Sequence, residues 1–158
     1  MNTMRVTRNR GFSMIELIVV IVLLGIVAAI ALPRWRGGNG FEERGVRDQI
    51  VAALRYAQKS AIATRRTVCV TFSSSPSLVS FAISSAYPAA NCTGGTTLAG
   101  PDGAALSVTA SSSITFASST ASFTFDAAGR ASAAATVTVT GLPAGQAITV
   151  ESETGYVH

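Results

Sequence analysis

The chain has 158 residues, of which 48% are hydrophobic and 13% are charged, and its net charge is +4. This length leaves room for one small globular domain once an N-terminal apolar segment is set aside. The single histidine, His158, stands at the last position and is expected to fray. A Ser/His/Asp or Cys/His site needs a histidine base that is held in place, and this sequence does not supply one. We therefore expect no catalytic residues and no enzyme activity.

An apolar run extends from Phe12 to Leu32 and contains one charged residue, Glu16. Its length suits a bilayer-spanning helix, which needs about 20 mainly apolar residues. A carboxylate at that depth costs roughly 3 kcal/mol or more, so it marks a functional position that requires a partner. Because the run holds no Lys, Arg or His, the partner has to come from another chain or from an amine created by processing.

A short basic leader precedes this run, Gly11 is followed directly by Phe12, and Glu16 stands at the fifth position counted from Phe12. This pattern resembles the N-terminus of a type IV prepilin or type II secretion pseudopilin. The resemblance implies that prepilin peptidase cuts between Gly11 and Phe12 and methylates the new amine of Phe12. That amine is then the expected partner of Glu16 in the next subunit, and the pairing offsets part of the cost of burying both charges.

A secretory signal peptide and a generic membrane anchor are the alternative interpretations of this segment. A signal peptide has an apolar region of about 7 to 15 residues followed by a small-residue cleavage site. Here the run is longer, and a proline and two arginines follow it. A generic anchor fits the hydropathy but gives no reason for Glu16 or for the junction of Gly11 and Phe12.

Charges on either side of the run indicate its orientation. Arg5, Arg8 and Arg10 precede it without any acid, and basic residues mark the cytoplasmic side of a membrane helix. We therefore expect residues 1–11 to be a cytoplasmic leader and residues 12–33 to make a single pass through the Gram-negative inner membrane, with its lipid as first partner. The rest is expected in the periplasm and then in a pilus or pseudopilus. Loss of the leader lowers the net charge to about +1, which weakens the case for a polyanion ligand.

Gly25 and Pro33 disfavour a helix within or beside the apolar run. They cost a helix interior about 1 and 3 kcal/mol respectively. We expect a helix break at each of them, where a kink forms when subunits leave the membrane and pack together.

Residues 34–66 are expected to contain a flexible glycine-rich spacer and then an amphipathic helix from about residue 41 to residue 66. Apolar residues recur there at spacings of three and four, which places them on one face at 100° per residue. The face expected to pack on a sheet consists of Val46, Ile50, Ala53, Leu54, Ala57 and Ala61. Charged residues occupy the opposite side, where Arg44 and Asp48 are spaced for a favourable pair.

Five further residues on this helix are candidate contacts. Val51 and Ile62 project among the charges and are candidates for touching a neighbouring helix in a filament, although exposed aliphatic residues are common without any role. Arg55, Lys59 and Arg66 form a stripe of cations that is a candidate DNA contact, because affinity for DNA comes mostly from contacts of Lys and Arg to phosphate. Filament packing competes for that surface, and the C-terminal half carries a single arginine, so DNA is the less favoured partner.

From residue 67 onward the composition changes to Ser, Thr, Ala, Gly and alternating β-formers. Turn-favouring segments separate these short runs. The expected strands are residues 67–72, 78–84, 106–109, 113–117, 121–125, 136–140 and 147–151, with 155–157 as a further candidate. A long helix followed by short antiparallel strands predicts an α+β fold, in which residues 67–158 form an antiparallel β-sheet or a two-sheet domain that packs on the helix.

The resemblance becomes narrower in this part of the chain. Residues 41–45, 54–59, 65–70, 125–130 and 148–156 are similar to the GspH/FimT group, and within it most similar to minor pilins of MSHA-type pili. This implies a minor pilin or pseudopilin at or near the filament tip that helps to initiate assembly. The implied partners are other major and minor pilins or pseudopilins and prepilin peptidase. Some members of the group bind DNA for uptake, which is the alternative function.

Cys69 and Cys92 are the two cysteines, and in an oxidising periplasm such a pair is expected to be joined. A bond closing a loop of about 24 residues stabilises a domain by roughly 3 kcal/mol in the chain-entropy model. The alternative is two free thiols, one of them buried as a small hydrophobe.

Acidic residues of the C-terminal region do not form a recognisable metal site. Asp102, Asp126, Glu151 and Glu153 are far apart in the sequence, and they lack both EF-hand spacing and a His/Cys cluster. An aspartate that stabilises a turn is the commoner explanation for Asp102 and Asp126. We therefore expect no metal and no cofactor.

Overall fold

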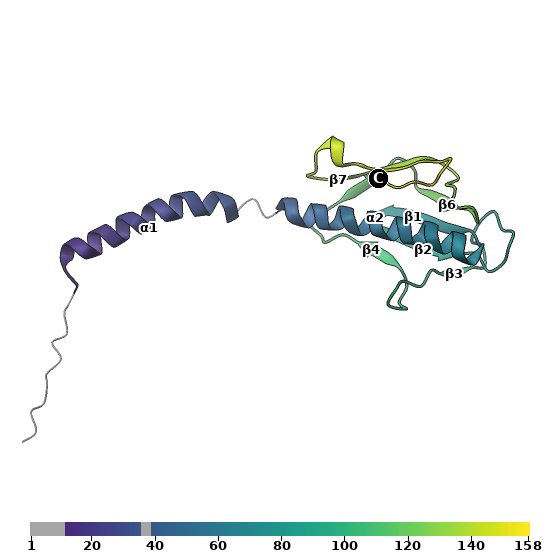
Figure 1. Ribbon diagram of the computed structural model, residues 1–158, viewed down its shortest axis with the longest axis horizontal. Helices are drawn as coiled ribbons and strands as arrows, with labels where there is room; N and C mark the ends of the chain where they lie inside the picture. Colours follow the sequence, from purple (N-terminus) through teal and green to yellow (C-terminus); the bar gives the residue numbers. More distant parts are fainter. Residues whose placement is uncertain (1–11, 36–38) are drawn as a thin grey trace, which may run out of the picture. The chain divides into compact units, whose positions relative to one another are not determined.

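The computed structural model describes residues 12–35 and 39–158, which belong to two compact units divided after Gly38 (Figure 1). The first unit contributes one helix, and the second, from Asn39 to His158, contributes a helix and all the strands. Gly11 and the rest of the leader lie outside the described residues. The helix expected within residues 34–66 is thus part of the same unit as the strands that follow it.

The first helix, α1, extends from Met14 to Trp35 without interruption. The helix is continuous through Gly25 and Pro33, and the kinks expected there when subunits leave the membrane and pack together stay a prediction. Gly25 costs a helix only about 1 kcal/mol, and the good helix formers Leu23, Leu24, Ala28 and Ala29 stand close to it on both sides. Pro33 stands in the last turn, where few backbone hydrogen bonds depend on it. Within the described residues, neither helix reaches the combination of length and apolar character that spanning a membrane requires.

The second helix, α2, extends from Asn39 to Thr64, so it begins two residues earlier than expected. Its predicted buried face is confirmed, since all six predicted residues are at most 8% exposed: Val46, Ile50, Ala53, Leu54, Ala57 and Ala61. This stripe forms because the 3.6-residue period aligns them, and it packs against the strands that follow.

A left-handed residue ends α2. Arg65 has a φ of 54°, its N–H bonds to the Ile62 carbonyl at 3.3 Å, and the Arg66 N–H bonds to the Ala61 carbonyl at 3.2 Å. This is the double hydrogen-bond pattern of a Schellman cap, which usually has glycine at the left-handed position. Arg66 consequently follows the helix and does not lie on its stripe, contrary to the sequence prediction.

Two antiparallel sheets make up the rest of the second unit. The larger sheet contains β1 (Val68–Ser74), β2 (Ser77–Ile83), β3 (Thr96–Thr97), β4 (Ser107–Thr109) and β6 (Ser122–Phe125). Its order is β3-β2-β1-β6, and β4 also pairs with β2. The smaller sheet has the order β5-β7-β8 and contains β5 (Phe116–Ser118), β7 (Ala135–Val139) and β8 (Ile148–Val150). A short 3-10 helix, η1 (Ala144–Gln146), precedes β8.

Most predicted strands are present within two or three residues of their expected ends, and the predicted α+β class and two-sheet arrangement are confirmed. The two-residue strand β3 was not predicted, because Thr96 and Thr97 lie in a Gly/Thr-rich stretch without alternation. The candidate strand at residues 155–157 is reduced to a bridge between Val150 and Val157. The C-terminal residues nevertheless pair with β8.

The core lies entirely within the second unit. Among the described residues, every buried hydrophobic residue falls between Val46 and Val157. Alternate residues of the strands face inward, as in β7, where Ala135, Val137 and Val139 are buried. Because the unit from Asn39 to His158 contains its own core and both sheets, it is a domain able to fold without α1.

Candidate functional site

Ser13 and Glu16 form the first turn of α1. The Ser13 side-chain oxygen accepts a hydrogen bond from the Glu16 backbone N–H at 3.2 Å, and the Ser13 carbonyl accepts bonds from the N–H groups of Glu16 and Leu17. Ser13 is thus the N-cap and Glu16 the third helical residue, the spacing of a capping box. Sequence reasoning missed this role, although a serine three residues before a glutamate and an apolar run was the available signal. The carboxylate also lies at the positive end of the helix dipole.

The described side chains of α1, as far as Ala29, are mostly apolar and exposed. The large apolar side chains from Phe12 to Val27 are 43–84% exposed, and Phe12 itself is 80% exposed. Glu16 is the only charged residue among residues 12–33. A helix that is apolar all round is normally buried in its working state, so these exposed side chains are candidates for contact with lipid or with other chains.

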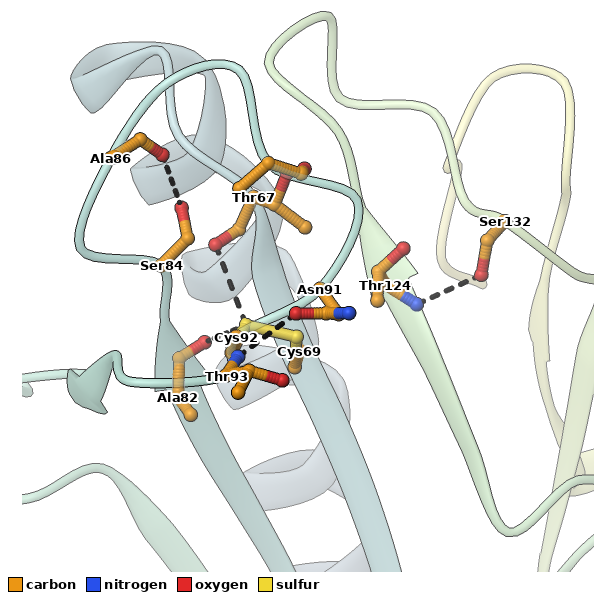
Figure 2. Close-up of a disulfide and its surroundings, with 11 residues drawn as sticks. Thr67, Cys69, Ala82, Ser84, Ala86, Asn91, Cys92, Thr93, Thr124 and Ser132 are labelled. Atoms are coloured by element: carbon orange, nitrogen blue, oxygen red, sulfur yellow. Dashed lines mark hydrogen bonds between the residues drawn. A yellow bond between two sulfur atoms is a disulfide. The ribbon is translucent and has the colours of Figure 1, made fainter.

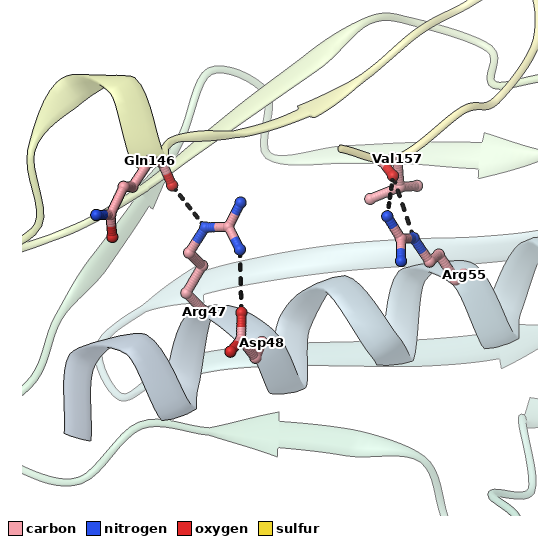
Figure 3. Close-up of polar contacts among 5 residues, drawn as sticks. All are labelled: Arg47, Asp48, Arg55, Gln146 and Val157. Atoms are coloured by element: carbon pink, nitrogen blue, oxygen red, sulfur yellow. Dashed lines mark hydrogen bonds and ion pairs between the residues drawn. The ribbon is translucent and has the colours of Figure 1, made fainter. Parts of the chain in front are cut away.

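Two arginines of α2 hold the C-terminal part of the chain (Figure 3). The Arg47 Nε donates to the Gln146 carbonyl at 2.8 Å, and the Nε and Nη2 of Arg55 donate to the Val157 carbonyl at 3.1 and 2.8 Å. Hydrogen bonds from a charged donor contribute about 1.5–3 kcal/mol each. These arginines therefore serve the fold of the domain, whereas the sequence analysis considered Arg55 as a candidate DNA contact.

Gln58 extends this row of donors by one more turn. Its Nε2 donates to the carbonyls of Gly129 and Thr154, both at 3.0 Å. The turns that carry these carbonyls approach so closely that a Cβ added to Gly155 would lie 2.0 Å from the Gly129 oxygen. We call the three donors Arg47, Arg55 and Gln58, with the carbonyls they bind, the C-terminal seam.

The seam changes the interpretation of the residues predicted on this side of α2. Val51 is 9% exposed and belongs to the core, so the prediction that it is a surface contact for a neighbouring helix is wrong. Ile62 is 43% exposed, and a Cβ added to Gly129 would lie 2.6 Å from its Cδ1. Ile62 thus partly covers a turn of its own chain, and a filament contact by its exposed part stays a prediction.

The predicted cation stripe is divided by the structure. The guanidinium of Arg55 is engaged by the Val157 carbonyl, whereas Lys59 and Arg66 are exposed. Asp48 pairs with Arg47 at 3.0 Å, in place of the expected pair with Arg44. DNA contact stays a prediction that depends on Lys59 and Arg66.

A disulfide joins β1 to the loop after β2 (Figure 2). Cys69 and Cys92 are bonded, with their Cα atoms 6.1 Å apart, so the predicted pairing is confirmed. The same loop is also attached by a hydrogen bond from the Thr67 hydroxyl to the Ala89 carbonyl. The base of the loop is therefore held at two points, while Tyr87 within it is 66% exposed.

His158 is anchored and not frayed as expected. Its N–H bonds to the Thr149 carbonyl at 3.0 Å, and its carbonyl accepts the Thr149 N–H at 2.8 Å. Its ring stacks on Tyr156 with 5.2 Å between centroids and lies 3.4 Å from the Glu151 carboxylate. His158 is held in place because the last residues of the chain pair with β8. An argument from composition does not detect such pairing.

The aspartates considered as metal ligands stabilise turns. The Asp126 carboxylate accepts the N–H groups of Ala128 and Arg130 at 2.8 and 2.9 Å, and the Asp102 carboxylate accepts that of Ala104 at 3.1 Å. Within the part of the chain that the structure describes, no group of three or more His, Cys, Asp or Glu residues is placed to hold a metal ion.

Two segments of the chain match known families. Residues 47–154, more than half of the chain, match the family described as the Type II transport protein GspH. Residues 6–32 match the prokaryotic N-terminal methylation motif. Over 53 residues, 34% of this chain, the sequence is 42% identical to the Type IV major pilin protein PilA of Myxococcus xanthus (strain DK1622). That alignment spans 24% of the relative's length.

Solved structures share the fold at low sequence identity. The minor pseudopilin EpsH from the type 2 secretion system of Vibrio cholerae superposes with a TM-score of 0.56 and 14% identity, covering 74% of this chain and 94% of that one. The type IV minor pilin FimU of Pseudomonas aeruginosa PAO1 superposes with a TM-score of 0.53 and 14% identity, covering 76% and 89%. At this identity the likeness is one of fold.

Proposed function

The chain belongs to the family of the Type II transport protein GspH, and from this premise we propose that it is a minor pilin or pseudopilin, a structural subunit of a type IV pilus or a type II secretion pseudopilus. The observation that carries the proposal is the combination of a self-contained domain with a helix whose described side chains are all uncovered. A subunit of this kind gains its fold from one unit and its attachment to other chains from the other.

Processing is the first step of the proposed function. Prepilin peptidase is proposed to cut between Gly11 and Phe12 and to methylate the Phe12 amine, and the match of residues 6–32 to the methylation motif supports this. Before assembly, residues 12–33 are proposed to lie in the inner membrane with the domain in the periplasm. The apolar run and the three leader arginines support that orientation.

Glu16 is proposed to bind the methylated amine of Phe12 in the adjacent subunit. Glu16 lies in the first turn of α1, so its carboxylate is at the same end of the helix as the N-terminus that cleavage would create at Phe12. Removal of one partner of a buried ion pair costs about 3–5 kcal/mol, because the other charge stays buried alone. The filament partners are other major and minor pilins or pseudopilins. Membership in an MSHA-type pilus and a place at the tip, where the subunit helps to initiate assembly, are the finer parts of the proposal.

The test compares the mature N-terminus and filament incorporation of the full chain with those of two variants. The parent is expected to begin at N-methylated Phe12 by mass spectrometry and to occur in sheared filaments. Glu16→Leu is expected to lower incorporation by about 100-fold, which corresponds to about 3 kcal/mol. Ile18→Leu, a conservative change in the same run, serves as the control and is expected to incorporate normally.

Each result bears on a different part of the proposal. If the chain still begins at Met1 and is absent from filaments, the proposed function itself is contradicted. A processed chain in which Glu16→Leu incorporates as well as Ile18→Leu would contradict only the ion pair. Filaments that carry the chain along the shaft in immunogold images would contradict its placement at the tip.

A further inference from the structure

The smaller sheet has one edge that the described domain leaves unpaired. At the opposite edge, β8 is covered by the last residues of the chain, which form backbone hydrogen bonds with it. β5 pairs with β7 alone. This pairing continues past both ends of β5, since the Thr140 N–H donates to the Thr115 carbonyl and the Ser119 N–H donates to the Thr136 carbonyl, both at 2.9 Å. The free edge therefore extends from Thr115 to Ser119.

The register of this pairing identifies the backbone groups that are not used. In an antiparallel pair, the N–H and C=O groups of alternate residues point to the partner strand, and those of the residues between them point away. Thr115 and Ser119 bond to β7, so Ala117, midway between them in the same register, does so as well. The N–H and C=O groups of Phe116 and Ser118 therefore face the free edge. Within the described chain, no backbone hydrogen bond reaches them.

β1 comes close to this edge and ends without pairing with it. β1 pairs with β6, and beyond that ladder the Phe72 N–H donates to the Ala121 carbonyl at 2.9 Å. After Phe72, β1 pairs only with β2 and runs into the turn between them. A notch of about 250 Å3 lies between the end of β1 and β5, and it is lined mainly by Phe72, Ser74, Phe116, Ser118, Thr120 and Ala121. The space beside the free edge of β5 is thus open.

The sequence around β5 lacks the devices that usually protect a free edge. Free edges pair readily with other strands, and proteins commonly block them with lysine, proline, a bulge or a covering loop. Residues 103–125, which include all of β5, contain neither a charged residue nor a proline. The neighbouring strand β7 is uncharged as well. A strand that pairs with Phe116 and Ser118 would therefore satisfy their free groups without desolvating any charge.

We propose that the edge from Thr115 to Ser119 pairs antiparallel with the same edge of a second copy of the chain, with a two-fold axis at Ala117. Such an axis places Phe116 opposite the partner subunit's Ser118, and both residues have free backbone groups that can bond to each other. Ala117 then faces its own counterpart across the axis. A residue on a two-fold axis meets itself, so a charge there would repel its copy, whereas Ala117 is small, uncharged and exposed. The edge is thus complementary to itself, and the pairing does not depend on the proposed function.

A charge swap at Ala117 tests the position of the axis, with sedimentation equilibrium of residues 39–158 as the measurement. The parent is expected to approach the mass of a dimer as its concentration rises. Ala117→Lys and Ala117→Glu are each expected to raise the dissociation constant about fivefold, because like charges then face each other at about 5 Å. An equimolar mixture of the two variants is expected to dimerise at least as well as the parent. Thr138→Lys, an exposed position opposite Ala117 on β7, is the matched control and should dimerise like the parent.

Ser118→Pro tests the backbone hydrogen bonds separately from charge. Proline lacks an N–H and is tolerated at an edge where the N–H faces outward, so the fold of the domain should be retained. The variant removes two hydrogen bonds from the dimer, one in each direction, and is expected to raise the dissociation constant about 30-fold. Ser118→Ala keeps the N–H and loses only the hydroxyl oxygen that accepts the Thr120 N–H. This control is expected to dimerise like the parent.

Three results would overturn the proposal. The first is a parent domain that stays monomeric at about 1 mM. The second is equal dimerisation of the Ser118→Pro and Ser118→Ala variants when thermal melting shows both to be folded. The third is a mixture of Ala117→Lys and Ala117→Glu that dimerises no better than either variant alone. If Ser118→Pro does not fold, the charge swap alone decides, because Ala117 is exposed and its substitution leaves the backbone groups in place.

Discussion

The two α-helices that the structure describes have similar lengths and different surroundings. All the described side chains of α1 are exposed, although most are large and apolar. In contrast, α2 buries a full stripe and donates three side chains to the C-terminal seam. The difference indicates that the stability of the domain depends on the buried face of α2 and not on the exposed side chains of α1. Changes at buried residues of α2 should therefore alter the stability of the domain, and changes in α1 should leave it unaltered.

The sharpest test of this division compares two leucines. Leu54→Ala in α2 removes a side chain that is fully buried and is expected to lower the free energy of unfolding by about 4 kcal/mol, because it deletes apolar contacts and leaves a cavity. Leu23→Ala in α1, where the side chain is 56% exposed, is expected to leave the melting of the domain unchanged in the full chain. Urea unfolding followed by circular dichroism measures both. Equal destabilisation by the two variants would break the comparison.

The disulfide should account for the next largest share of domain stability. Replacing Cys69 and Cys92 together with alanine is expected to lower the free energy of unfolding of residues 39–158 by about 3 kcal/mol, through loss of a cross-link that constrains the unfolded chain. A reducing agent should destabilise the parent by a similar amount and have no effect on the double variant. Insensitivity of the parent to reduction would show that the cross-link does not hold the loop in place.

The C-terminal seam predicts a smaller loss of stability, one that hydropathy alone would not predict. Gln58→Leu leaves the carbonyls of Gly129 and Thr154 without their donor and is expected to cost about 2 kcal/mol, the penalty of an unsatisfied polar group. Gln49→Leu, at an exposed position of the same helix, is expected to change stability by less than about 0.5 kcal/mol. Amide hydrogen exchange should then accelerate at residues 152–158 in the first variant only. Uniform exchange across the domain would argue against a local seam.

The smallest expected effect is a stabilisation. Arg65 adopts a left-handed conformation at the C-cap of α2, which costs an L-residue roughly 1–2 kcal/mol relative to its usual conformation. Arg65→Gly is therefore expected to raise the free energy of unfolding by about 1 kcal/mol. Arg66→Gly, the neighbouring control, should produce no gain. A loss of stability in Arg65→Gly would mean that its side chain contributes more than its backbone costs.

Local patterns were sufficient for much of the fold. The 3.6-residue spacing of Val46, Ile50 and Leu54 predicted the buried face of α2, and the runs of β-formers between turn signals predicted most strands. These predictions succeeded because helix period and strand alternation depend on neighbours a few residues apart. The same local reasoning placed Arg66 on the cation stripe of the helix, and this was wrong because the left-handed Arg65 ends α2 before it.

The sequence by itself determined which segments have which character. It shows an apolar run with a single acid, a glycine-phenylalanine junction at its start, an amphipathic helix and a pair of cysteines. The tertiary structure alone decided which surface of α2 is free. The carbonyls that engage Arg47 and Arg55 lie 99 and 102 residues away along the chain. Helical period states on which side a residue lies, but only the path of the whole chain determines what covers that side.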